Sequence, residues 1–191
     1  DDLKHEGKIR NMGVSVERVE AALKAIEYEN VTTVQIIFNM FRQRPAEKFF
    51  AAAAIKNVGI IARVPLASGL LTGKFTASTS FGKDDHRTFN RNGEAFDKGE
   101  TFSGIDYMKG LKAVDELKKV FPQGTDLASV ALKWILMHHE VSCVIPGASR
   151  PDQVISNLKA SGVSELTADQ MEAVKQVYRQ YIWPELSNEK W

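Results

Sequence analysis

Short apolar runs alternate with helical segments along this chain, and this alternation most limits how it can fold. The runs at residues 8–14, 33–38, 59–64 and 141–145 have the length and composition of β-strands. Between and after them lie segments whose apolar residues recur every three or four positions, as in helices that cover a sheet. A series of strand–helix units predicts an α/β fold with a parallel sheet and right-handed crossovers.

Capping residues and helix breakers mark where the expected helices begin. Serine and threonine side chains can accept hydrogen bonds from the first free amides of a helix, and proline is favoured in its first turn. The sequence Pro122-Gln123-Gly124 separates two helices between the third and fourth strands, and the chain from Trp183 onward looks irregular. The residues expected to cap or open the helices are Ser15, Pro45, Tyr107, Thr125 or Asp126, Ser149, and Thr167 with Gln170.

Two glycine-containing segments follow the third and fourth strands. Residues 65–74 read Pro-Leu-Ala-Ser-Gly-Leu-Leu-Thr-Gly-Lys, and residues 144–153 read Val-Ile-Pro-Gly-Ala-Ser-Arg-Pro-Asp-Gln. Glycine lets backbone amides approach a ligand, and amides at the carboxyl end of a strand beside a helix form an anion site. We therefore expect both segments to hold phosphate groups at one edge of the sheet, where the long loop 65–105 also begins.

The composition is that of an ordinary globular protein. With 191 residues, 43% of them hydrophobic and 26% charged, the chain can bury a sizeable core, and residues 1–191 are expected to form one domain. The 25 basic and 24 acidic side chains leave a net charge of +1, which gives no electrostatic basis for binding nucleic acid or an anionic membrane. No apolar run approaches the roughly 20 residues of a membrane span, and the charged start is no signal peptide, so a cytoplasmic location is expected.

Candidate reactive and metal-binding side chains are few. Cys143 is the only cysteine and lies inside the apolar run of the fourth strand, so we expect a buried, inert thiol and no internal disulfide. Asp84, Asp85 and His86 invite a metal or acid–base interpretation. They lie in a long loop without a fixed partner in the sequence, so no metal site is expected.

Four motifs stand in a recognisable order. They are Gly7-Lys8-Ile9-Arg10, Gly13-Val14-Ser15, residues 65–74, and Ile145-Pro146-Gly147-Ala148 with Gln153 and Asn157. In this order and spacing they resemble the motifs of aldo-keto reductases, and the loop 84–90 resembles a bacterial branch of that family. Members of the family are (β/α)₈ barrels of the TIM-barrel type that bind NADPH across the rim and transfer its hydride to an aldehyde or ketone. The resemblance therefore implies an NADP(H)-dependent oxidoreductase acting on a small-molecule carbonyl substrate.

The resemblance implies that only the second half of the barrel is present. It begins at the family's fifth strand, so the four expected strands correspond to strands five to eight. The family's catalytic Asp, Tyr, Lys and His lie on the other half, so no residue here is assigned a catalytic role, and the chain alone is expected to be inactive. The implied partner is the missing N-terminal half-barrel or a second copy of this chain, because four strands leave two unpaired edges. The alternative function is a non-catalytic nucleotide-binding or self-associating half-barrel module.

The resemblance also assigns residues to the nicotinamide end of the cofactor. Ser15 and Gln35 match residues that bind the carboxamide, although Gln35 also fits a polar residue that merely lines the barrel rim. Arg63 stands near the position where many relatives place an aromatic ring against the nicotinamide. A guanidinium can stack on the same face.

The rest of the cofactor is assigned to the two glycine-containing segments. Arg150 beside Ser149 suits a 2′-phosphate, which favours NADP over NAD, while the alternative for Arg150 is a solvated surface charge. The residues matched to the pyrophosphate are Leu66, Ser68, Gly69, Leu71, Gly73 and Lys74, and those matched to the adenosine end are Gly147, Ser149, Arg150, Gln153 and Asn157.

Overall fold

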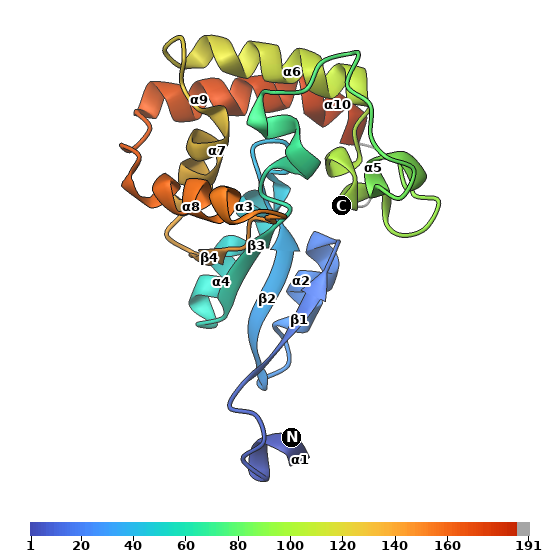
Figure 1. Ribbon diagram of the computed structural model, residues 1–191. Coiled ribbons are helices and arrows are strands. Elements are labelled where there is room, and N and C mark those ends of the chain that lie inside the picture. The colour runs from blue at the N-terminus through green and yellow to red at the C-terminus, as the bar shows by residue number, and fades with distance from the viewer. Residues whose placement is uncertain (187–191) are drawn as a thin grey trace.

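A parallel sheet with helices packed against it organises residues 1–186, the part of the chain that the computed structural model describes (Figure 1). The sheet has four strands in the order β1-β2-β3-β4, and every neighbouring pair is parallel. Each connection therefore crosses over to the adjacent strand, as in part of a closed α/β barrel. The strands are β1 Met12–Val16, β2 Val31–Ile37, β3 Gly59–Arg63 and β4 Val141–Val144.

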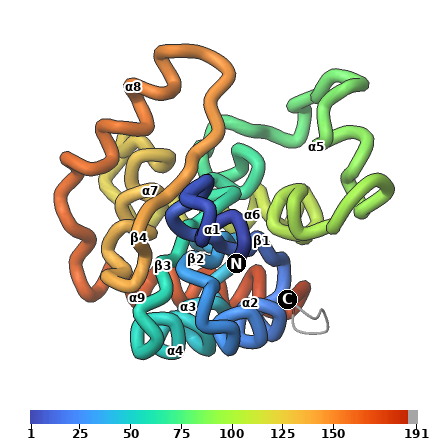
Figure 2. Tube along the Cα trace, turned by 90° about the horizontal axis from the view of Figure 1, so that it is seen from below, coloured from blue at the N-terminus to red at the C-terminus, as the bar shows by residue number. Residues whose placement is uncertain are grey.

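Several of the helices lie together on one side of the sheet. Seen from below in Figure 2, α2, α3, α4 and α9 lie together on the same side of the strands. Helix α9 begins with the expected capping box, in which the Thr167 hydroxyl accepts from the Gln170 amide and the Gln170 side chain accepts from the Thr167 amide. The helices are α1 Asp2–His5, α2 Val19–Ala25, α3 Arg44–Lys48, α4 Phe50–Ile55, α5 His86–Phe89, α6 Tyr107–Val120, α7 Leu127–Leu136, α8 Pro151–Lys159, α9 Ala168–Val177 and α10 Trp183–Leu186.

The two faces of the sheet differ in burial. On the helix-covered face, Val34, Ile60 and Ala62 are fully buried. On the opposite face, the strand register aligns one residue from each strand into a row of Ser15, Gln35, Ile61 and Cys143, all of them half-buried or exposed. Both outer strands, β1 and β4, have one unpaired edge within residues 1–186.

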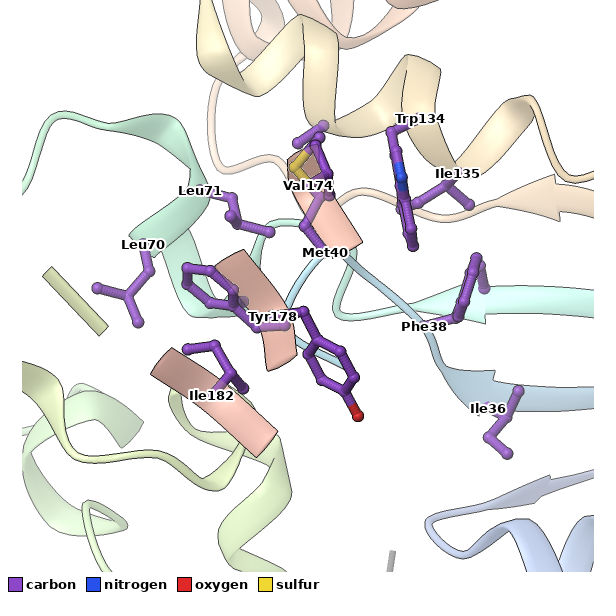
Figure 3. Packing of buried hydrophobic residues seen from close by; sticks show 14 of the residues in the cluster. Ile36, Phe38, Met40, Leu70, Leu71, Trp134, Ile135, Val174, Tyr178 and Ile182 are labelled. Atoms are coloured by element: carbon purple, nitrogen blue, oxygen red, sulfur yellow. The ribbon is translucent and has the colours of Figure 1, made fainter. Parts of the chain in front are cut away.

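Aromatic packing joins the sheet to the helices. Phe38, just after β2, stacks on Trp134 of α7 with ring centroids 5.0 Å apart, and meets Phe50 of α4 edge-on at 4.7 Å. Figure 3 shows Phe38 and Trp134 facing each other, with Leu71 and Tyr178 farther along the same core. The cluster therefore extends from the end of the sheet to the segment that follows β3.

The loop 65–105 contains regular structure of its own. It contains short 3-10 turns and α5, and a buried asparagine organises its second half. The Asn90 side-chain oxygen accepts hydrogen bonds from the amides of Ala95 and Phe96, both at 2.8 Å, while its nitrogen donates to the Thr101 hydroxyl. Asn39, also fully buried, donates to the Val64 carbonyl and so fixes the end of β3.

Several expected boundaries are wrong. The first strand begins at Met12 rather than at residue 8, because its partner strand begins at Val31, the residue that Met12 faces. Ser15 lies inside β1 and caps no helix; α2 begins three residues after the strand with Arg18 as its N-cap. The chain from Trp183 is helical through α10, and residues 187–191 of the expected irregular tail lie outside the described residues.

Two expectations about β4 and about the helix that follows it are also wrong. Cys143 is exposed rather than buried, because β4 is an outer strand and this residue shares its face with Ile61, opposite the buried Ile60 and Ala62. Helix α8 begins after Arg150 rather than after Ser149. Gln153 organises this helix start, since its side-chain oxygen accepts hydrogen bonds from the amides of Ser149 and Arg150 at 2.7 and 3.1 Å.

Candidate functional site

A cavity of about 850 Å³ lies between the two glycine-containing segments. The segment after β3 and the segment after β4 form two of its walls, and the loop 65–105 forms a third. Its volume falls in the range of small-molecule sites. The lining residues are Val64, Pro65, Leu66, Ser68, Gly69, Thr72, Lys74, Phe75, His86, Arg87, Phe96, Glu100, Ile145, Gly147, Ala148, Ser149, Arg150 and Gln153.

The wall after β3 is a strained turn. Val64, Ala67 and Ser68 have positive φ angles of 50°, 47° and 55°, which side chains other than glycine rarely adopt. Gly69 follows with φ 99°. The amides of Gly69 and Leu71 both donate to the Leu66 carbonyl, so the chain folds tightly back on itself. The result is a backbone loop that faces the cavity at the carboxyl end of the sheet.

The wall after β4 exposes its backbone. A side chain at Gly147 would meet no atom within 4 Å, so ligand atoms can approach this peptide closely. Gln153 holds the following turn through its contacts with Ser149 and Arg150. The Arg150 guanidinium forms an ion pair with Asp152 at 3.1 Å, and its side chain remains 62% exposed.

The residues assigned to the nicotinamide lie just outside the cavity lining. The Ser15 hydroxyl donates to the Gln35 side-chain oxygen across β1 and β2, at 2.9 Å. Arg63 is largely buried and forms ion pairs with Glu100 and, at 3.5 Å, with Glu17. Glu100 lines the cavity, whereas Arg63 does not, so Arg63 is linked to the cavity by its ion pair with this carboxylate.

Three other assigned residues contribute no side chain to this cavity. Leu71 is fully buried in the core, which follows from its place in the tight turn. A side chain at Gly73 would contact Lys118 and Leu127, on the far side of the turn. Asn157 lines a separate cavity of about 310 Å³ beside α8. The cavity thus brings together Leu66, Ser68, Gly69, Lys74, Gly147, Ser149, Arg150 and Gln153 from the assigned set.

Residues of the loop complete the lining and were not assigned from the sequence. Phe75, His86, Arg87, Phe96 and Glu100 all face the cavity. The sequence signal that could have found them is the run Asp84-Asp85-His86-Arg87, because charged residues clustered in a long loop beside a predicted phosphate site suggest ligand contact.

Three cationic side chains, those of Lys74, Arg87 and Arg150, line the cavity. Arg87 is paired with Asp85 and Arg150 with Asp152, while the Glu100 carboxylate in the lining is paired with Arg63. Hydrogen bonds from Arg87 lower the pKa of Asp85 beside the cavity to about 2, so this aspartate stays ionised at neutral pH. Cationic groups next to open backbone amides match the chemistry of a bound phosphate or pyrophosphate.

Residues 1–186 contain neither a cluster of metal-binding side chains nor a membrane-spanning helix. No group of three or more His, Cys, Asp or Glu side chains in this range is arranged to hold a metal ion. None of the helices in the same range combines the length and the apolarity that a membrane span requires.

Similarity to known proteins identifies the class of protein to which this chain belongs. The sequence matches the Aldo/keto reductase family over residues 1–179, and the chain belongs to this family. Among curated relatives, it is 27% identical to the uncharacterized oxidoreductase YqkF of Bacillus subtilis, covering 96% of this chain and 55% of the relative. It is 26% identical to the L-glyceraldehyde 3-phosphate reductase of Escherichia coli O157:H7, covering 89% and 49%. The chain spans about half the length of the curated relatives it matches.

Solved structures agree with the sheet topology. The glycerol dehydrogenase AKR11B4 from Gluconobacter oxydans matches with a TM-score of 0.71 and 29% identity, covering 95% of this chain and 52% of that one. The holo form of the aldo-keto reductase AKR11C1 from Bacillus halodurans matches with a TM-score of 0.66, covering 92% and 52%; at 24% identity it supports the fold alone. The four parallel strands are consistent with a partial barrel of this kind.

Proposed function

We propose that this chain is the cofactor-binding half of an aldo/keto reductase that uses NADP(H) to interconvert carbonyl compounds and alcohols. The observation that carries the proposal is the cavity of about 850 Å³ between the two glycine-containing segments. Open backbone at Gly147 and three cationic side chains suit a dinucleotide with its phosphates. Family membership supports oxidoreductase chemistry for the whole protein.

Each end of the cavity would take a different part of the cofactor. The strained turn at Ser68 and Gly69, with Lys74, would bind the pyrophosphate. Arg150 would contact a 2′-phosphate, which favours NADP(H) over NAD(H), because a guanidinium forms charge-assisted hydrogen bonds with phosphate oxygens. Its present partner Asp152 is exposed, so the guanidinium can exchange this carboxylate for a ligand at low cost.

The nicotinamide would lie toward the sheet. The Ser15–Gln35 pair would hydrogen-bond its carboxamide, and Arg63, fixed by Glu100, would contact the ring. When bound, the reduced cofactor supplies a hydride for the carbonyl carbon of the substrate. The residues named here bind and orient the dinucleotide and supply no proton.

Proton transfer would require residues other than those that line this cavity. A tyrosine that protonates a carbonyl oxygen at neutral pH needs a lowered pKa. Burial instead raises the pKa of Tyr178 to about 12, and Tyr107 donates its hydroxyl to the Thr76 carbonyl at 2.9 Å. Neither lines the cavity, so we infer that the chain alone is inactive and requires an N-terminal half-barrel for reduction.

Titration of the purified chain with NADPH and NADH, followed by cofactor fluorescence, tests the binding. We expect saturable NADPH binding that is weaker for NADH, and Arg150→Gln should abolish this difference. No fluorescence change at high micromolar NADPH would refute the proposed function. Reduction of a carbonyl substrate by the chain alone would refute its proposed inactivity.

Self-association is a second candidate function, favoured by the two unpaired sheet edges. Within residues 1–186, β1 and β4 each lack a neighbour on one side. Two copies related by a twofold axis along the strands would place β4 of each beside β1 of the other, giving eight parallel strands. Light scattering after size-exclusion chromatography tests this, and a monomer at high micromolar concentration would exclude it.

A further inference from the structure

The Asp85–Arg87 pair stands where the loop meets the strained turn. The Arg87 guanidinium donates to both carboxylate oxygens of Asp85, from Nε at 2.9 Å and from Nη2 at 2.5 Å. The same carboxylate accepts the backbone amide of Arg87 at 2.9 Å and thereby caps α5. Two-point pairing of this kind fixes the plane of the guanidinium as well as its position.

Aromatic rings hold the guanidinium in place. It lies over the Phe81 ring, 4.5 Å from the ring centroid, and 5.5 Å from the centroid of Phe75. Such cation–π contacts are favourable and restrict the side chain further. Arg87 is therefore ordered before any ligand arrives.

From this position Arg87 contacts the strained turn directly. Its Nη1 atom donates to the Ser68 carbonyl at 3.4 Å. A Cβ atom placed on Gly69 would lie 3.5 Å from the same nitrogen and 2.7 Å from the Phe75 ring. The loop thus packs against the two residues whose positive φ angles give the turn its shape.

The turn needs external support because its conformation is unfavourable on its own. Ala67 and Ser68 both have positive φ without being glycine, and such residues persist only where their surroundings hold them. Arg87 supplies such a contact at the carbonyl of Ser68. It also lines the cavity itself.

We propose that the Asp85–Arg87 pair positions the Ser68–Gly69 turn for the pyrophosphate of the cofactor. The inference rests on the proposed cofactor binding and extends it to a loop residue outside the glycine-containing segments. Arg87 acts as a positioning residue, since it holds the backbone that receives the phosphates, and Asp85 holds Arg87.

Arg91 provides a matched control. Its guanidinium lies on the same aromatic cluster, 5.1 Å from the ring centroids of Phe102 and Tyr107, and it does not line the cavity. Its Nε donates to the Arg87 backbone carbonyl at 2.9 Å, so Arg91→Met removes a contact with Arg87 but keeps the Arg87 side chain that meets the turn. Arg91→Met and Arg87→Met remove the same charge from the same loop. Asp84→Asn and Asp85→Asn form a second pair, because Asp84 is an exposed neighbour of Asp85.

Calorimetric titration of the chain with ADP-ribose, which has a pyrophosphate, and with adenosine 2′-phosphate, which has none, tests the proposal. Arg87→Met is expected to weaken ADP-ribose binding about tenfold and to leave adenosine 2′-phosphate binding unchanged. Asp85→Asn should shift binding in the same direction, and the two control variants should bind as wild type. Equal weakening of both ligands, or an equal effect of Arg91→Met, would overturn the positioning role.

Amide hydrogen exchange of residues 66–71 without ligand provides an independent measurement. Exchange in this segment should be faster in Arg87→Met than in Arg91→Met, since the Arg87 side chain donates to the Ser68 carbonyl, whereas the Arg91 side chain donates to the Arg87 carbonyl. Equal exchange in the two variants would refute the positioning role even if ligand binding changed. Failure of the wild-type chain to bind either ligand would refute the proposed cofactor site, while the exchange comparison would still report on the contact between Arg87 and the turn.

Discussion

The hydroxyl of Ser68 connects the turn after β3 to Glu100, 32 residues later in the chain. It donates to the Glu100 carbonyl at 2.8 Å and accepts a hydrogen bond from the Phe102 amide at 3.1 Å. The Glu100 side chain in turn forms an ion pair with Arg63 at the end of β3. One residue pair thus joins the turn, the far end of the loop and the sheet.

Ser68→Ala should destabilise the fold by about 1–3 kcal/mol, because it leaves a carbonyl and an amide in a water-poor region without their partner. Chemical denaturation measures the change. Ser78→Ala is the control, since Ser78 is exposed in the same loop and bonds only to the nearby Thr76 hydroxyl. A loss of stability equal in the two variants would contradict the prediction.

Gly69→Ala should cost more than about 1 kcal/mol of stability and weaken cofactor binding, because an added Cβ meets the Phe75 ring at 2.7 Å and φ is 99°. Thermal unfolding and NADPH titration measure the two effects. Gly82→Ala is the matched control, since no atom lies within 4 Å of its added Cβ. The idea fails if both alanine variants behave alike.

Leu71→Ala should lower the free energy of unfolding by about 2–5 kcal/mol, as expected for a fully buried leucine. Leu66 is only half-buried and lines the cavity, so Leu66→Ala should cost less stability. Urea denaturation of both variants checks the order. The reverse order would mean that Leu71 is not the core residue described here.

Stability should fall as the pH is lowered below about 6.5, because burial lowers the pKa of His138 in the folded chain. The unfolded chain then binds the proton more readily, so the contribution is present above the unfolded pKa and is lost as the pH falls toward the folded pKa. Chemical denaturation at several pH values should show that the free energy of unfolding falls less steeply with decreasing pH in His138→Gln than in the wild type.

Cys143 should react with Ellman's reagent in the native chain nearly as fast as in the unfolded chain, since its thiol is exposed. Absorbance at the thionitrobenzoate wavelength follows the reaction. If an N-terminal half-barrel or a second copy covers the open face of the sheet, adding it should slow the reaction. A protected thiol in the isolated monomer would contradict the exposure described here.

The sequence was sufficient to predict the parallel α/β sheet, since three of its four strands lie within two residues of their expected bounds. The first strand was placed too early because its start depends on pairing, and Met12 pairs with Val31, the first residue of β2. Cys143 was assigned to the interior because an apolar run does not reveal which side of an outer strand faces the helices.

The geometry of the cavity could be predicted from the sequence only where the residues in contact are close to each other in the chain. Gln153 and Arg150 are close in sequence, and the motif there predicts their geometry. The contacts of Ser68 with Glu100 and of Arg87 with Ser68 span 32 and 19 residues, across a loop without regular periodicity. Such contacts depend on how the loop folds back on the sheet, which a single sequence does not specify.

The two free edges of the sheet allow two modes of growth. Pairing of β4 in one copy with β1 in the next is a head-to-tail contact, and such contacts generate a closed ring or an open filament according to the rotation between neighbours. A ring of two copies forms only if each sheet turns through half a circle. The curvature of this sheet therefore decides whether high concentrations of the chain would give discrete particles or fibres.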